Sequence, residues 1–289
     1  MPHVTSPDGT PLAYEIHGSG PPVVLVAGAL GGRDTWSDLV RHLDGVTAVP
    51  YDRRARGHSG DSSVRDGRVP VAGAVDRELA DLSALITEVG GQATLVGYSS
   101  GSQLTVLAAL ADPRVRGLVL YEPPFSDADE HERGTSGVRG GGDMGPDADE
   151  HEHTPMPDLL ADLIARRRRD DAVRVFLAEV VGLPAEMVAG IAGSPDFPAM
   201  TRDAGSLVYD AALQAAHPTV TPMANRIRVP TAVVRGRDTW PFLRTAAEAT
   251  AGAIPGAELR VIDGADHGMV PEAFAPEVDH LLGRVREAS

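Results

Sequence analysis

The chain has 289 residues, 42% of them hydrophobic, which is enough apolar material for one large domain or for one domain with a sizeable insertion. Its 26 lysines and arginines stand against 41 aspartates and glutamates, and the resulting charge of −15 repels phosphate backbones and anionic lipid, so we expect neither nucleic acid nor a membrane as a partner. There is no cysteine, which excludes a disulfide framework, a thiolate metal site and a cysteine nucleophile.

The chain begins with MPHVTSPDGTPLAYE, which lacks a basic start followed by an apolar run. No later stretch approaches the roughly 18 uninterrupted apolar residues of a membrane span. We therefore expect a cytoplasmic protein. The SPDGTP part of the opening is a turn signal, so an opening hairpin is predicted.

Short apolar runs alternate along the chain with amphipathic segments of helix length. The predicted strands are residues 12–16, 22–27, 46–51, 93–98, 117–121, 231–235 and 258–262, and the predicted helices are residues 35–43, 74–89, 102–111, 242–251 and 273–285. Strands joined by crossover helices form mostly parallel sheets. The sequence therefore predicts an α/β fold, a mostly parallel sheet flanked by helices.

The alternation breaks after residue 121, and no obvious strand occurs between residues 123 and 229. Within this interval, residues 159–181 and 206–216 have helical spacing and are separated by turn sequences. A helical insertion is the simplest account. We predict a cap at residues 125–224, inserted into a core formed by residues 1–124 and 225–289.

The first part of the insertion contains DADEHE twice, at residues 127–132 and 147–152, around a glycine-rich segment. Such a composition cannot bury enough apolar area to offset the entropy lost on ordering, so we expect an acidic, mobile loop at about residues 126–156. A metal site formed by His131, His151 and His153 is the alternative. We favour the solvated loop and predict no metal, because a metal site needs rigid, oriented ligands.

The pentapeptide GYSSG, residues 97–101, lies between a predicted strand and a predicted helix. A serine on a strained strand-to-helix turn projects its hydroxyl clear of the sheet, and small residues on either side let neighbouring backbone approach. Ser99 is therefore the candidate nucleophile, and the backbone N–H of Ser100 is a candidate oxyanion donor at the start of the helix. A glycine–serine turn without chemistry is the alternative.

A serine hydroxyl needs a base to become a good nucleophile. The late segment LRVIDGADHGMVPEAF places His267 in a loop directly after the last predicted strand, with a final helix beyond it. This position predicts that His267 is the base. An ordinary solvent-exposed histidine is the alternative.

Five motifs together resemble the α/β-hydrolase fold superfamily: VLVAGALGG, YDRRARGHSG, GYSSG, RGRD and GADHG, in this order. The resemblance extends from near the N-terminus to residue 121 and again from residue 229 to the end. It implies a helical cap after the superfamily's sixth strand, which is here the strand ending at Tyr121. It also implies a carboxylesterase-like Ser-His-acid triad that needs no metal or organic cofactor.

The resemblance also carries over further site residues. The first oxyanion donor follows a glycine at the end of the superfamily's third strand, which is here the backbone N–H of Ala29, and residues 52–60 match an architectural turn. The acid commonly stands three residues after a glycine at the end of the seventh strand. Asp238 follows Gly236 one residue too early, whereas some relatives place the acid at the end of the sixth strand, where this chain has Glu122. Both carboxylates remain alternatives.

These residues predict hydrolysis of an ester or thioester through an acyl-enzyme, with Ser99 as nucleophile and His267 as base. A cap over the carboxyl ends of the strands, rich in apolar residues, indicates a hydrophobic small-molecule substrate. The fold also hosts perhydrolases, carbon–carbon bond hydrolases, natural-product tailoring acyltransferases or cyclases, and non-catalytic ligand binders. Neither the substrate nor the oligomeric state follows from the sequence.

Overall fold

The computed structural model describes residues 1–125 and 154–288. Within these residues a seven-stranded sheet has the order β3 (His17–Gly18), β5 (Thr47–Pro50), β4 (Pro22–Val26), β6 (Ala93–Tyr98), β7 (Val115–Tyr121), β8 (Thr231–Gly236) and β9 (Glu258–Ile262). In this sheet β3 runs antiparallel to β5, and all other neighbouring strands are parallel. The predicted opening hairpin is a separate antiparallel pair, β1 (His3–Thr5) and β2 (Pro11–Ala13).

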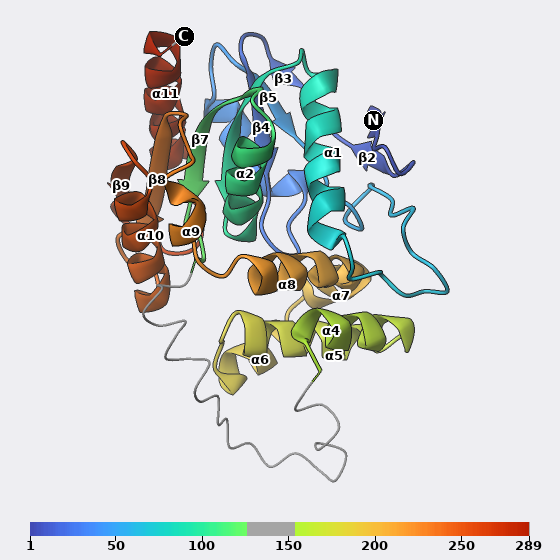
Figure 1. Cartoon of the computed structure of the whole chain (residues 1–289). Coiled ribbons are helices and arrows are strands. Elements are labelled where there is room, and N and C mark those ends of the chain that lie inside the picture. The colour runs from blue at the N-terminus through green and yellow to red at the C-terminus, as the bar shows by residue number, and fades with distance from the viewer. Residues whose placement is uncertain (126–153, 289) are drawn as a thin grey trace.

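Both faces of the sheet are apolar, because alternate residues of a strand face opposite sides. On β4, Val24 and Val26 belong to one buried cluster, and Val23 and Leu25 belong to another. The first cluster is covered by α1 (Ala74–Glu88), α2 (Ser100–Ala111) and α10 (Pro241–Ala253), and the second by α11 (Pro271–Glu287) and two 3-10 turns. Figure 1 shows these helices on the two sides of the sheet. The predicted α/β fold is confirmed.

Helices are inserted between β7 and β8, where the cap is predicted. They lie at the carboxyl end of β7, toward which its arrowhead points in Figure 1. Leu160, Phe176 and Leu207 are buried in a third apolar cluster that belongs mainly to the cap. In the part of the insertion that the structure describes, the elements are α4 (Met156–Ala165), α5 (Arg169–Val175), the π-helical segment η4 (Phe176–Val180), α6 (Ala185–Ala192), α7 (Phe197–Arg202), the 3-10 turn η5 (Ala204–Ser206), α8 (Leu207–Ala216) and α9 (Thr221–Ala224).

Two predicted elements that precede the GYSSG turn differ from the structure. The strand predicted at residues 12–16 ends at Ala13, because the chain leaves the hairpin and Tyr14 forms an isolated bridge with Tyr51 instead. The helix predicted at residues 35–43 is two 3-10 turns, η1 (Arg33–Trp36) and η2 (Leu39–His42). The buried residues Trp36 and Leu39 are three positions apart, a spacing that suits a 3-10 turn as well as an α-helix.

The helical pattern predicted at residues 159–181 is helical in the structure but is interrupted after α4. Arg167 has a φ of 62°, in the left-handed region, and this residue separates α4 from α5. A left-handed residue ends an α-helix, because the backbone can no longer continue the i to i−4 hydrogen bonds. The apolar periodicity continues across the break and does not reveal it.

Some predictions fall outside the described residues. The mobile acidic loop at about residues 126–156 lies mostly there, as does the alternative metal site at His131, His151 and His153, and the domain boundaries at 124/125 and 224/225 also stay predictions. Among the described residues, no group of three or more histidines, aspartates or glutamates is arranged to hold a metal ion. Within residues 1–125 and 154–288, every helix is too short or too polar to cross a membrane.

Candidate active site

Ser99 stands at the sharp turn between β6 and α2. Its φ of 52° and ψ of −124° lie in a region that non-glycine residues rarely occupy, at a cost of about 1–3 kcal/mol. Two hydrogen bonds hold the turn: Ser99 N–H donates to the Tyr121 carbonyl oxygen (2.9 Å), and Ser102 N–H donates to the Ser99 carbonyl oxygen (2.8 Å). A side chain at Gly101 would collide with the carbonyl oxygen of Val26. Glycine therefore lets α2 begin this close to β4.

His267 and Glu122 contact each other through Nδ1 and Oε2, which lie 3.0 Å apart. Glu122 directly follows β7, is fully buried, and accepts two further hydrogen bonds, from the N–H of Gly236 (2.8 Å) and the hydroxyl of Thr239 (2.5 Å). A carboxylate only accepts hydrogen bonds, so the imidazole carries its proton on Nδ1 and its lone pair on Nε2. The pair thus orients His267 with Nε2 as the basic nitrogen.

Asp238, the other candidate acid, lies elsewhere. It is exposed, and its backbone N–H donates to the carbonyl oxygen of Ala265 (3.0 Å). The next residue, Thr239, is the one that reaches Glu122. Thr239 stands three residues after Gly236, where the superfamily commonly has its acid. The one-residue shift noted in the sequence therefore places a hydroxyl at that position, not a carboxylate.

The candidate oxyanion donors approach Ser99 from two elements. Ser100 is the first residue of α2, and the first N–H groups of a helix have no acceptor within the helix. The other donor, Ala29, follows Gly28, where an added Cβ would lie 3.0 Å from both the Cβ of Ser99 and the carbonyl oxygen of Tyr98. The absence of a side chain at Gly28 lets the loop after β4 lie against the serine. The structure thus brings both donor segments to Ser99.

Two tyrosines that the sequence patterns do not reveal hold the loop of His267. The hydroxyl of Tyr98 donates to the carbonyl oxygen of His267 (2.9 Å), and that of Tyr121 lies 3.2 Å from the carbonyl oxygens of Asp266 and Gly268. Burial and the nearby carboxylates raise the pKa of Tyr98 to about 12, so its hydroxyl stays protonated and remains a donor at neutral pH. In the sequence, the only feature that marks these two tyrosines is that each ends a predicted strand. That feature does not show which carbonyl oxygen a tyrosine hydroxyl contacts.

Aromatic rings surround the imidazole. The ring of Trp240 stacks on His267, with centroids 5.1 Å apart and an angle of 28° between the planes. The ring of Tyr98, the residue before Ser99, has its centroid 5.2 Å from that of the imidazole. The loop of His267 is therefore packed against the strand end that carries the candidate nucleophile.

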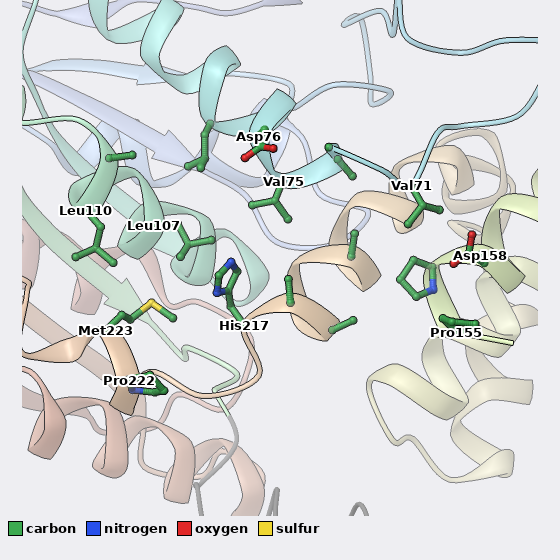
Figure 2. A pocket seen from close by; sticks show the side chains of 18 of the residues that line it. Val71, Val75, Asp76, Leu107, Leu110, Pro155, Asp158, His217, Pro222 and Met223 are labelled. Carbon is green, nitrogen blue, oxygen red and sulfur yellow. The ribbon is translucent and has the colours of Figure 1, made fainter. Parts of the chain in front are cut away.

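A cavity of about 930 Å³ lies elsewhere, between α1, α2, α8 and α9 (Figure 2). Leu107 and Leu110 of α2 and Met223 of α9 line it. Leu107 is eight residues beyond Ser99, which corresponds to about 12 Å at 1.5 Å per helical residue. None of the candidate catalytic residues is among the lining residues. This cavity is therefore separate from the candidate site of Ser99 and His267.

A mostly parallel sheet with a serine on a strained strand-to-helix turn at its carboxyl edge is the arrangement of an α/β-hydrolase fold. The chain belongs to the alpha/beta hydrolase family, whose family model matches residues 23–278. It is 28% identical over 287 residues to the non-heme chloroperoxidase CPO-A1 of Kitasatospora aureofaciens, with 94% of each chain covered.

Solved structures agree with this assignment. An alpha/beta hydrolase from Sphaerobacter thermophilus has 35% sequence identity and a TM-score of 0.79, and the match covers 97% of this chain and 100% of that one. A thermophilic esterase from Thermogutta terrifontis shares the fold at 22% identity, with a TM-score of 0.66 and 98% of both chains covered. Family membership supports a hydrolase role.

Proposed function

We propose that this protein is a serine hydrolase that cleaves an ester or thioester of a hydrophobic small molecule through an acyl-enzyme. The observation that carries the proposal is the hydrogen bond from His267 to the buried Glu122, beside the strained turn of Ser99. A strained serine and a buried carboxylate both cost stability. An enzyme retains them because together they activate the nucleophile.

Acylation begins when Nε2 of His267 takes the hydroxyl proton of Ser99 and Oγ bonds to the carbonyl carbon of the substrate. The carbonyl π electrons move to oxygen, and the backbone N–H groups of Ala29 and Ser100 donate to that oxyanion. The intermediate then collapses, the bond to the leaving alcohol or thiol breaks, and the imidazolium returns its proton to that group. Glu122 holds the imidazole in the required tautomer and stabilises the imidazolium.

Deacylation uses the same groups with water as nucleophile. Nε2 of His267 takes a proton from water while the water oxygen bonds to the acyl carbon. The bond to Ser99 Oγ then breaks, Oγ regains its proton, and a carboxylic acid leaves. These steps use no metal or organic cofactor.

We assign the acid to Glu122 and not to Asp238. Support comes from the 3.0 Å contact between Glu122 and Nδ1 of His267, whereas Asp238 is exposed. The hydroxyl of Thr239 also donates to the same carboxylate oxygen, Oε2, and so helps to fix the orientation of the carboxylate.

The surroundings of the site support an apolar substrate. Ala29 and Leu30, in the loop of the first oxyanion donor, pack against the apolar cluster of the cap. Phe242 is 45% exposed and stacks on Trp240, which stacks in turn on His267. An apolar acyl or alcohol group would gain about 25 cal/mol for each Å² of apolar surface that it buries there.

Perhydrolysis is the second candidate, favoured by the similarity to a protein named as a chloroperoxidase. In this reaction hydrogen peroxide replaces water as the nucleophile that attacks the acyl-enzyme. The bond to Ser99 Oγ breaks as before, and a peracid leaves in place of a carboxylic acid. The same residues serve both reactions.

A series of p-nitrophenyl esters of increasing acyl length tests the proposal. We expect the wild type to release p-nitrophenol, and Ser99→Ala to lower kcat/KM by at least about 10³-fold because the acyl-enzyme cannot form. His280→Ala is the control, since His280 pairs with Glu258 outside the site. Turnover by Ser99→Ala at the wild-type rate would refute the proposal. Peracid formation on addition of hydrogen peroxide would identify the second candidate.

A further inference from the structure

The turn at residues 52–60 and the cap helix α8 share a buried cluster of charges that no step of the proposed reaction uses. Asp210 in α8 is 1% exposed and accepts hydrogen bonds from the hydroxyl of Ser100 (2.8 Å), from Nη1 of Arg53 (3.0 Å) and from Nη2 of Arg56 (2.6 Å). Burial opposes the charge of Asp210, but Arg56 and Arg53 outweigh it and hold the pKa of this carboxyl below its usual value. The cap and the core are therefore joined here by two ion pairs, both of which involve Asp210.

The same arginines contact the strand end that leads to the first oxyanion donor. Nη1 of Arg53 donates to the carbonyl oxygen of Ala27 (3.1 Å), and Nη1 of Arg56 donates to that of Gly28 (3.2 Å). The carbonyl of Gly28 and the N–H of Ala29 are the two ends of one planar trans peptide group, so they point in opposite directions. When Arg56 fixes the carbonyl, it also fixes the direction of the N–H.

Asp210 contacts the residue of the second oxyanion donor, Ser100, without an arginine between them. Its Oδ1 accepts a hydrogen bond from the hydroxyl of Ser100, and the backbone N–H of that residue is the second proposed oxyanion donor. One cap carboxylate thus bonds to Ser100 itself and, through Arg56, to the peptide group of Ala29. A cation bonded to a peptide carbonyl also polarises the peptide and strengthens its N–H as a donor.

We propose that Asp210 and Arg56 are positioning residues for the oxyanion hole, which hold the N–H groups of Ala29 and Ser100 so that both point to the same oxygen. The inference rests on the proposed function, because it requires an oxyanion beside Ser99. It gives the second serine of the GYSSG bend a role in its side chain as well as in its backbone. It also makes the contact of α8 with the core a requirement for fast acyl transfer.

Arg56→Lys tests the inference, with Arg54→Lys as the matched control. Lysine keeps the positive charge but has a single ammonium group in place of a fork, so it cannot bond Asp210 and the Gly28 carbonyl with the same geometry. Arg54 belongs to the same turn and is also buried. Its carboxylate partners are Asp8, Asp61 and Asp81, which lie outside the oxyanion loop. We therefore expect similar losses of stability but different effects on the reaction.

The readouts are the rate constant for fluorophosphonate labelling of Ser99, kcat and KM for a p-nitrophenyl ester, and the thermal unfolding midpoint. Labelling needs the oxyanion hole, because the phosphonyl oxygen occupies it while Oγ displaces fluoride. Loss of a whole oxyanion donor costs about 10²–10³-fold in kcat, so we expect Arg56→Lys to slow labelling and kcat by at least about 10-fold. We expect KM to change by less than about 3-fold, since the oxyanion forms only in the transition state. Arg54→Lys should keep the wild-type rates.

Two results would overturn the inference: wild-type labelling by folded Arg56→Lys, or an equal loss of rate in Arg54→Lys. If Arg56→Lys does not fold, Ser100→Ala decides, because it removes one hydroxyl and should slow labelling by about 3–10-fold. Wild-type labelling of Ser100→Ala would then contradict the inference. Failure of the proposed function is a separate result, since the wild type itself would not be labelled at Ser99.

Discussion

Both oxygens of the Glu122 carboxylate are occupied: the Gly236 N–H donates to Oε1, and Thr239 and His267 contact Oε2. The backbone of Glu122 is also strained, with a φ of 50°, and its N–H donates to the carbonyl oxygen of Val234 (2.8 Å). A fully buried carboxylate held by this many donors has one orientation. This is the property that a group needs if it is to fix the tautomer of a catalytic histidine.

The first prediction concerns the acid. We expect Glu122→Gln to lower kcat for a p-nitrophenyl ester by about 10³–10⁴-fold, because an amide can hold the imidazole in the wrong tautomer. Asp238→Asn is the matched control and should stay within about 2-fold of the wild type, as an exposed side chain away from His267. Steady-state kinetics of both variants measures this. A large loss in Asp238→Asn with a small one in Glu122→Gln would reverse the assignment.

The second prediction concerns Thr239, whose hydroxyl donates to Glu122. Thr239→Val keeps the shape of the side chain but removes the donor, and we expect kcat to fall by about 10-fold, since hydrogen bonds to charged groups contribute about 1.5–3 kcal/mol. Thr245→Val serves as the control, because its hydroxyl bonds to a carbonyl of its own helix. Equal kcat values for the two valine variants would show that the hydroxyl of Thr239 does not support the acid.

Sequence patterns single out Ser99 and His267 because each is defined by its neighbours along the chain. They leave the acid open because the choice depends on which carboxylate meets an imidazole far away in sequence. Glu122 and His267 are separated by 145 positions. The role of Thr239 is equally hard to predict. A shift of one residue decides whether a hydroxyl or a carboxylate stands three positions after Gly236.

At the scale of elements, the position of the bend depends on how closely α2 packs on β4. Gly101 lies in the first turn of α2 against the carbonyl of Val26, so the helix and the strand touch at this point through backbone alone. Any displacement of α2 would move the N–H of Ser100 together with the turn of Ser99. The site is therefore sensitive to a packing distance between two elements of the core.

The third prediction compares two helical glycines. We expect Gly101→Ala to lower the free energy of unfolding by about 3 kcal/mol, because the methyl group would overlap the carbonyl of Val26. Gly190 lies in α6 with open space around it, so Gly190→Ala should raise stability by about 0.5–1 kcal/mol through its higher helix propensity. Urea unfolding measures both. An unchanged free energy of unfolding in Gly101→Ala would show that α2 does not need to approach β4 this closely.

Elements with a long, regular apolar pattern, such as α1, α11 and β6, are predictable from sequence because the pattern repeats over the whole element. The differences between predicted and observed helices depend on single backbone angles or on ambiguous spacing. Arg167 breaks the helix predicted at residues 159–181 through one positive φ. Residues 35–43 have a three-residue spacing of buried side chains, which two kinds of helix share.

At the scale of the whole molecule, the apolar burial of the described residues occurs in three clusters, two on the faces of the sheet and one mainly in the cap. The Asp210 cluster joins the cap to the core at the site itself, through Arg53 and Arg56. The sequence predicts a cap because the strand alternation stops. It cannot predict where the cap contacts the core, since these ion pairs join residues more than 150 positions apart.

The fourth prediction follows from the charge of Asp210. Asp210→Asn leaves Arg56 without a carboxylate partner among the described residues, and we expect a loss of about 3 kcal/mol in unfolding free energy at pH 7. The pKa of Asp210 is lowered by folding, so its contribution is present above the ordinary pKa of about 3.9 and is lost as the pH falls through the lower, folded value. The stability difference between wild type and variant should therefore shrink in acid.

Urea unfolding of both proteins, from pH 7 down to the lowest pH at which both fold, measures this difference. Asp196→Asn is a suitable control, since Asp196 is an exposed cap residue whose side chain makes no capping hydrogen bond at the start of α7. A difference that stays constant or grows toward low pH would contradict an ionised Asp210 in the folded protein.

The central claim is that Ser99 is an activated nucleophile, and covalent labelling with a fluorophosphonate followed by peptide mapping tests it most directly. The account predicts one adduct on the wild type, located on Ser99 and not on the adjacent Ser100, which is absent in Ser99→Ala and formed at least about 10²-fold more slowly in His267→Ala. A wild type that acquires no adduct, or a Ser99→Ala variant that is labelled as fast as the wild type, would contradict it.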